Sequence, residues 1–224
     1  MLKPKRKITR KEIQRDPFLE TVDKLEYNIN KNRKIYINIA IGLIIALIAF
    51  NVIKNKQSER LIMADAALGR ALVAIEQGDL DNAQFQLETI ISEYDGETSA
   101  LVSGYHLGKI KFEKGDFSTA ENYLLHYMEE RPVNIFIPGA SKMLAAIAIT
   151  NGDRDGAEKY LDKGIELASR ETDKLALNLE KVRLILNDDR GSEARSIVEQ
   201  VLSTENISPR IKQKAEELLG MMPS

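Results

Sequence analysis

The sequence predicts an all-α protein in which one transmembrane helix precedes an α-solenoid of about four helix-turn-helix repeats and a capping helix. Three observations support this fold class: a helix-favouring composition, one long uncharged apolar segment, and residue columns that recur every 37 positions. Leu, Ala, Ile, Glu and Lys dominate and Trp is absent, a mixture that favours helices over sheets. With 43% hydrophobic and 29% charged residues, the chain has the composition of a folded protein.

The charges of the chain separate into a basic start and an acidic body. Residues 1–34 carry 11 Lys or Arg and 5 Asp or Glu, whereas residues 54–224 carry 21 basic and 29 acidic residues. The basic start suits an anionic membrane surface. The acidic body lacks the excess of Lys and Arg that phosphate contacts need, so we expect no nucleic-acid partner. Cysteine is absent, which excludes disulfides and a thiolate nucleophile.

The uncharged segment at residues 35–53 has the length of a transmembrane helix. At about 1.5 Å per residue, its 19 residues reach roughly 28 Å, close to the ~30 Å hydrocarbon core of a bilayer. A cleaved signal peptide would begin sooner and end in small residues. A buried core helix rarely lacks polar residues on every face. We therefore predict a single-pass membrane anchor at residues 35–53.

The flanks of this segment favour a cytoplasmic N-terminus. Residues 1–34 form the short and strongly basic flank, and long domains cross membranes largely regardless of charge. We expect a basic cytoplasmic tail at residues 1–34 and a repeat domain at residues 54–224 on the other side of the membrane. No proline or loop cluster lies between residue 54 and Gly78, so the membrane helix is expected to continue into the first repeat.

A short amphipathic helix is expected within the basic tail. Asp16 and Pro17 have the order of a helix cap and a first helical residue. Apolar residues then follow at helical spacing: Phe18, Val22, Leu25 and Ile29. This helix would lie on the cytoplasmic leaflet or dock a partner, or it would only set the orientation of the membrane segment. The sequence leaves these alternatives open.

A turn of glycine followed by aspartate occurs three times, at Gly78, Gly115 and Gly152, with a constant period of 37 residues. Other columns keep the same register: Ala83, Ala120, Ala157 and Ala194; Leu87, Leu124, Leu161 and Val198; and the small residues Ala71, Gly108 and Ala145, broken by Val182. The glycine ends the first helix of a pair and the aspartate caps the second. Small residues let two helices cross closely, and the pairs stack because none can bury its apolar face alone.

These columns resemble the tetratricopeptide repeat (TPR) family, and the second unit matches its pattern best. The matching residues there are Leu107-Gly108, the turn Gly115-Asp116-Phe117, Ala120 and Pro132. The resemblance covers residues 61–208 in four units, with residues 209–221 as a capping helix. It is weakest in the fourth unit, where the glycine of the turn at residues 187–191 is displaced.

The period of 37 residues exceeds the usual TPR length of about 34, which implies longer loops between repeats. One of these loops carries the apolar run Ile135-Phe136-Ile137. We expect this run to pack into the core, because a contiguous exposed apolar patch is uncommon on a folded domain.

The order of tail, anchor and repeat domain is similar to that of the bacterial inner-membrane family of ancillary SecYEG translocon subunits. This resemblance implies a scaffold with a periplasmic domain that binds exported proteins or chaperones near the translocon. An alternative is a structural subunit of a membrane complex, which forms homo-oligomers through the apolar face of its last repeat.

The sequence offers little for catalysis. His106 and His126 lack the spacing of a helical zinc pair, and no cysteine completes a site. Residues 104–109 look like a phosphate loop, but they are one residue short and lack the Ser or Thr after Lys109. We therefore expect no enzymatic activity and neither a metal nor another cofactor.

TPR solenoids bind their partners on the surface that the first helix of each repeat lines. The corresponding positions here form two levels: Leu68, Tyr105, Lys142 and Leu179, and one helical turn on, Leu72, Lys109, Ala146 and Arg183. The candidate partner-binding residues among them are Tyr105, Lys109, Lys142 and Arg183. An aromatic platform with a positive patch would hold an extended peptide or an acidic segment of a partner. The alternative is that these four residues are only solvated.

The sequence lacks the carboxylate clamp of some TPR domains, which is built from Lys, Asn and Arg. At the level where the resemblance places asparagine, it has Lys109, Ala146 and Arg183. A receptor for the C-terminal tail of a chaperone is therefore not expected.

Overall fold

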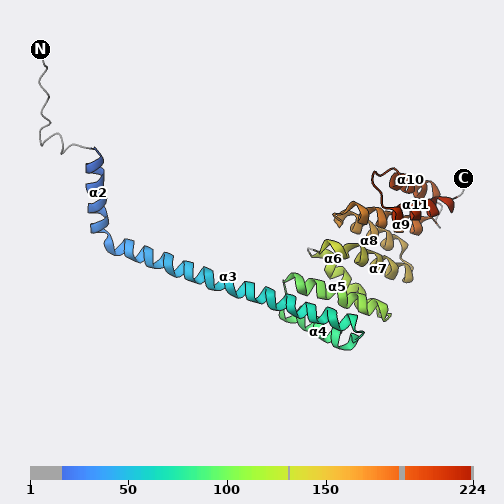
Figure 1. Ribbon diagram of the computed structural model, residues 1–224, viewed down its shortest axis with the longest axis horizontal. Coiled ribbons are helices and arrows are strands. Elements are labelled where there is room, and N and C mark those ends of the chain that lie inside the picture. The colour runs from blue at the N-terminus through green and yellow to red at the C-terminus, as the bar shows by residue number, and fades with distance from the viewer. Residues whose placement is uncertain (1–16, 131, 187–189, 223–224) are drawn as a thin grey trace, which may run out of the picture. The chain divides into compact units, whose positions relative to one another are not determined.

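The computed structural model describes residues 17–130, 132–186 and 190–222, and all regular elements in these ranges are helices (Figure 1). The all-α prediction is confirmed. The chain divides into two units, residues 1–59 and residues 60–224. The cap expected at Asp16 lies outside the described residues, as do residues 1–15 of the basic tail and residues 187–189 of the displaced turn.

The first unit contains α2 (Pro17–Lys31) and the beginning of α3 (Arg33–Glu76). In α2 the side chains of Val22, Leu25 and Ile29 are exposed. The long helix α3 includes all of residues 35–53 and continues without a break to Glu76. By length and composition, α3 is the one helix in the described residues that could cross a membrane, and no residue of its most apolar stretch is buried in this structure.

The second unit is a stack of four helix pairs, which follow one another in chain order in Figure 1. The first pair joins the end of α3 to α4 (Leu80–Glu93). The others are α5 (Thr98–Glu113) with α6 (Phe117–Glu129), α7 (Ile137–Thr150) with α8 (Arg154–Leu167), and α9 (Glu171–Ile185) with α10 (Gly191–Leu202). The prediction of four repeats is confirmed.

The three Gly-Asp turns share one geometry, as the sequence predicts. Gly78, Gly115 and Gly152 have φ of 78°, 77° and 77°, in the left-handed region that glycine adopts cheaply. Each turn has the two backbone hydrogen bonds of a Schellman motif, such as Gly78 N to Ile75 O and Asp79 N to Ala74 O, both 3.0 Å. The aspartate then accepts a hydrogen bond from the backbone N–H three residues later, at 3.4, 3.3 and 2.8 Å in the successive repeats.

Close helix crossing explains the column of small residues. Ala83, Ala120, Ala157 and Ala194 are completely buried. At Gly108 a Cβ atom would lie 2.9 Å from Leu124 Cγ, and Leu124 is itself completely buried. The backbone of α5 therefore approaches α6 more closely than any side chain at this position would allow.

The last repeat is covered by α11 (Pro209–Gly220), which packs against α9 and α10. Ile211, Ala215 and Leu218 join the core cluster of this repeat with Val198 and Val201. The capping helix is therefore present as predicted. The idea that the apolar face of the last repeat pairs with a second copy is wrong, because α11 already covers that face.

The fourth repeat lacks the Gly-Asp sequence of the other turns, and an ion-pair network joins its two helices to α8. Arg190 is the N-cap residue of α10, but its side chain forms no capping hydrogen bond with the helix. Its guanidinium instead binds both carboxylate oxygens of Glu158 in α8, at 2.6 and 3.0 Å, and also contacts Glu193 at 2.8 Å. Lys181 of α9 contacts Glu158 at 3.0 Å and Asp162 at 2.8 Å. Bidentate pairing of this kind fixes direction as well as distance, so the network orients α8, α9 and α10.

Replacing Gly108 by alanine is expected to lower the free energy of unfolding by about 1–2 kcal/mol, because the added methyl group meets Leu124 in a filled core. Gly104→Ala on the same helix is the matched control, since a Cβ there meets nothing within 4 Å. Its better helix propensity should stabilise the chain by up to about 1 kcal/mol. Urea unfolding of the full chain in detergent, followed by circular dichroism, compares the two. Equal effects would contradict the close approach of α5 and α6.

The stability of the chain is expected to depend on the ionised form of Glu158. Hydrogen bonds from Arg190, followed by those from Lys181, hold the pKa of Glu158 at about 2, below its ordinary 4.5. Because the folded state lowers this pKa, the stabilisation is complete above pH 4.5 and is lost as the pH falls toward 2. The urea midpoint of the wild type should therefore fall over this range, and that of Glu158→Gln should fall less. Glu199→Gln, an exposed change on α10, should keep the pH profile of the wild type.

Candidate functional site

The first helices of successive repeats lie next to one another and form a common surface. α5 contacts α7, and α7 contacts α9. Tyr105 and Lys109 belong to α5, Lys142 to α7 and Arg183 to α9. The repeat columns therefore placed all four candidate residues on this series of helices.

Lys142 and Arg183 line one groove, which we call the α7–α9 groove. It holds about 310 Å³ and is lined by Lys142, Ala145, Ala146, Ile149, Arg154, Leu161, Glu180, Arg183 and Leu184. Its apolar members come from all three helices, and the four charged members comprise three cations and one carboxylate. The groove therefore combines an apolar floor with a net positive charge, in a unit that carries more acidic than basic residues.

The cations of the groove differ in how firmly they are held. Lys142 is exposed and forms no ion pair within residues 17–130, 132–186 and 190–222. Arg183 contacts Glu180 at 3.3 Å, and its side chain remains 49% exposed. Arg154 instead donates a hydrogen bond to the backbone carbonyl of Leu184, so it ties α8 to the end of α9. Lys142 and Arg183 are thus the two cations that a ligand can reach at little cost, because exposed ion pairs are weak.

Tyr105 does not provide the exposed aromatic platform that the sequence suggested. Its residue is only 8% exposed. The ring stacks on Phe136 with 4.6 Å between centroids, and it lies 5.4 Å from the ring of Tyr127. Burial, and after it the charge of Glu113, raises the pKa of Tyr105. The physical reason is the loop between the second and third repeats, whose short 3-10 helix η1 (Asn134–Phe136) brings Phe136 against the ring.

The same loop contains the apolar run at residues 135–137, and its conformation determines which of these side chains are buried. Ile137 is buried and Phe136 is half-buried, as expected of core packing, but Ile135 is 60% exposed. The Tyr127 hydroxyl donates a hydrogen bond of 2.7 Å to the Val133 carbonyl, which holds the loop on α6. The prediction of a buried run is therefore correct for two residues and wrong for Ile135.

Lys109 and the two histidines lie outside the α7–α9 groove. Lys109 is exposed and contacts Glu113 of its own helix at 3.8 Å. Burial, and after it the charge of Lys109, lowers the pKa of His106 to about 4, so this ring is neutral at pH 7. Among the described residues, no three His, Asp or Glu side chains gather as a metal site.

Sequence reasoning missed the residues that α8 contributes to the groove. Arg154 is the first residue of α8 and Leu161 belongs to the buried leucine column, so neither stands at a first-helix position. Glu180 and Leu184 lie beside Arg183 in the chain and follow from its placement. Ile149 stands one and two periods after the apolar residues Phe112 and Ile75, yet it is 48% exposed at the groove.

Residues 29–204 match the family model of the tetratricopeptide repeat-like domain. Two solved structures of nearly identical TPR-like repeats, from a proposed kinesin light chain of Podosopora anserina, are similar to the chain, and one of them carries a substitution. Each is 18% identical to this chain and superposes on it with a TM-score of 0.50. The matched region covers 70% of this chain and 91% of the solved chain. At this identity the likeness shows the fold alone. No curated protein matches the chain.

Proposed function

The chain belongs to the tetratricopeptide repeat-like domain family, and from this premise we propose that it is a membrane-anchored scaffold whose α7–α9 groove binds an extended acidic segment of another protein. One observation carries the proposal: Lys142 and Arg183 stand exposed over an apolar floor, in a unit that is otherwise acidic. The family supports a protein-binding scaffold in general, and the chemistry of the groove supports the class of ligand.

The composition of the groove favours a peptide with both acidic and apolar residues. Leu161, Leu184 and Ile149 offer contacts to apolar side chains, while the two exposed cations lie on different helices and would meet carboxylates at separate points of a ligand. Complementary charge speeds association and rejects basic partners. The basic tail of the chain itself is therefore a poor ligand for this groove.

The anchoring part of the proposal is supported by α3. Residues 35–53 carry no charge and lie within a helix that continues to Glu76, so no flexible linker separates the apolar segment from the first repeat. We place the N-terminus in the cytoplasm and the repeats in the periplasm of a bacterial inner membrane, from the basic tail and the resemblance in architecture. Exported chains, chaperones and translocon subunits are the partners that this location would supply.

Reversing the charge of the groove should abolish its preference for acidic ligands. In Lys142→Glu/Arg183→Glu, the Kd for fluorescein-labelled peptides that combine Glu with Leu should rise at least about tenfold, and the wild-type Kd should rise with NaCl. Fluorescence anisotropy with the full chain in detergent measures both. Lys212→Glu/Lys214→Glu on α11 carries the same charge change away from the groove and should bind like the wild type. An equal loss in both variants would show that only net charge matters.

The anchor and its orientation can be tested by labelling single cysteines, because the chain has none. A membrane-impermeant maleimide added to spheroplasts should label Ser203→Cys, in the repeat unit, and should spare Thr9→Cys until the membrane is opened. The protein should resist carbonate extraction, whereas Ile44→Lys/Leu47→Lys should be released, because charges inside the bilayer are costly. Labelling of Thr9→Cys alone in intact spheroplasts would show the opposite orientation. Extraction of the wild-type protein by carbonate would contradict the membrane anchor.

A further inference from the structure

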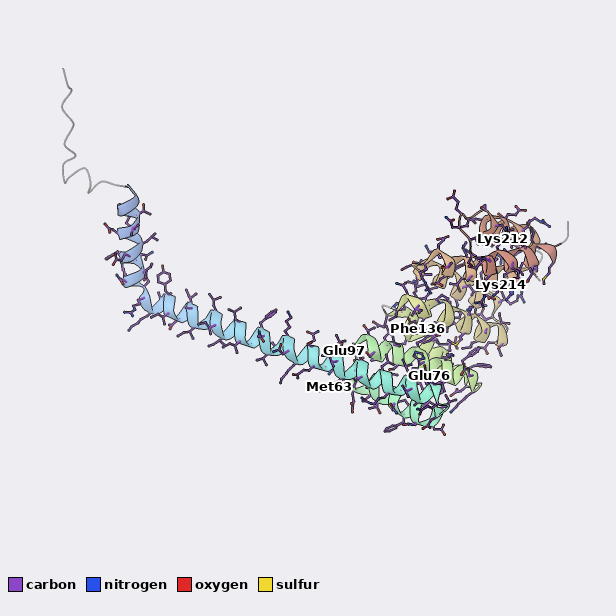
Figure 2. All side chains as sticks on the ribbon, in the orientation of Figure 1. Met63, Glu76, Glu97, Phe136, Lys212 and Lys214 are labelled. Atoms are coloured by element: carbon purple, nitrogen blue, oxygen red, sulfur yellow. The ribbon has the colours of Figure 1, made fainter. Side chains whose placement is uncertain are left out.

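The two ends of the repeat stack differ. At the C-terminal end, α11 buries Ile211, Ala215 and Leu218, leaves Lys214 half-buried and exposes its other charged residues. In Figure 2, Lys212 and Lys214 mark this end, and Met63 and Glu76 mark the other. At the other end no helix among the described residues covers the outer side of α3. Ile62 is 65% exposed there and Val73 is 49% exposed.

The exposed side of α3 occupies the positions through which every later repeat packs on its predecessor. We define the N-terminal face as Ile62, Ala66, Gly69, Arg70 and Val73. One period on, the counterparts of its last two members, Leu107 and Ile110, are at most 2% exposed and join the core cluster of the first repeat. Two periods on, Leu144 and Ile147 pack in the same way on the second repeat. The N-terminal face is therefore a stacking surface that lacks a preceding repeat.

Arg70 indicates the chemistry of what would cover this face. Its counterpart three periods on, Lys181, also stands where the second and third repeats have leucine. Lys181 finds Glu158 and Asp162 on the preceding repeat, at 3.0 and 2.8 Å. Arg70 has no acidic partner among the described residues. A neighbour that covers Arg70 would bury an unpaired charge unless it brings a carboxylate to the guanidinium.

We infer that the N-terminal face binds the same face of a second copy of this chain, with the two α3 helices parallel around a twofold axis. Ile62, Ala66, Gly69 and Val73 follow one another at spacings of four, three and four, which is the apolar seam of a two-helix coiled coil. In that register Asp65 and Arg70 flank the seam five residues apart, the offset that pairs opposite charges between parallel helices. One oxygen of Asp65 accepts a hydrogen bond from the Ser99 hydroxyl of its own chain, and the residue stays exposed, so the other oxygen of each Asp65 meets Arg70 of the other copy.

Two features favour a second copy over a longer array or an antiparallel pair. A head-to-tail array would need the C-terminal end of the stack, which α11 covers, so only a closed twofold pair remains for self-association. The parallel direction rests on the anchoring proposed above, because two copies in one membrane enter the repeat unit in the same direction. A Cβ atom placed at Gly69 would meet nothing within 4 Å of its own chain, so no contact within one copy blocks the approach of a second helix at this position.

Engineered cysteine and swapped charges test this pairing in the full chain, which has no native cysteine. In native membranes treated with a mild oxidant, Gly69→Cys should form a disulfide-linked dimer, whereas Glu216→Cys on the outer side of α11 should not. Adding Arg70→Glu should reduce the crosslinked fraction at least about fivefold, and adding Asp65→Arg as well should restore it. Circular dichroism of each variant confirms that it is folded.

The outcomes separate this inference from the function of the groove. A monomeric mass in detergent, together with no Gly69→Cys crosslink in membranes, would overturn the pairing, as would a crosslink to a different protein. Failure of the charge swap to restore a crosslink in folded protein would overturn the parallel register. Peptide binding by the α7–α9 groove should be unchanged in Arg70→Glu, so loss of acidic-peptide binding in the wild type would count against the groove alone.

Discussion

The close crossing of helices at small residues is the constraint on which the whole repeat unit depends. At Gly108 the α5 backbone leaves no room for a Cβ atom beside Leu124, and the alanine column of the second helices is completely buried. Each pair so formed still exposes one apolar side, which only a neighbouring repeat can bury. The α7–α9 groove exists because neighbouring first helices are brought together in this way, and the open N-terminal face exists because the first repeat has no predecessor.

The junction of the third and fourth repeats shows that charge can replace apolar packing at a stacking position. Lys181 stands where leucine packs in the second and third repeats, and it is accommodated because Glu158 and Asp162 face it. Arg190 adds a second cation to Glu158, which lowers the pKa of that carboxylate to about 2. This junction is therefore directional but sensitive to acid, and it is formed by α8, α9 and α10, the first two of which also line the groove.

Most of the fold could be predicted from the sequence, because a pattern that recurs in several repeats is less ambiguous than a single segment. The Gly-Asp turns and the alanine column follow from one period, and the capping helix is the segment that follows the last repeat. The site was less predictable. Lys142 and Arg183 were placed by their columns, but Arg154 reaches the groove from a second helix, which no first-helix column includes. Tyr105 was misjudged because the extra loop length shows that a loop exists and not where Phe136 comes to lie. The uncovered end was not predicted, because the repeat columns mark a stacking position without showing whether a neighbour occupies it.

The groove and the N-terminal face use different residues on different repeats, so a ligand at one of them covers no residue of the other. If two copies pair through their first repeats, each dimer carries two cationic grooves in one membrane. A partner with two acidic segments would then bind the second groove at the high effective concentration set by the first. Weak individual sites suffice in such an arrangement, which agrees with a groove whose reachable charges are two exposed cations. The avidity would disappear in a monomer with an intact groove, so pairing and peptide recognition are separable contributions to the strength of binding.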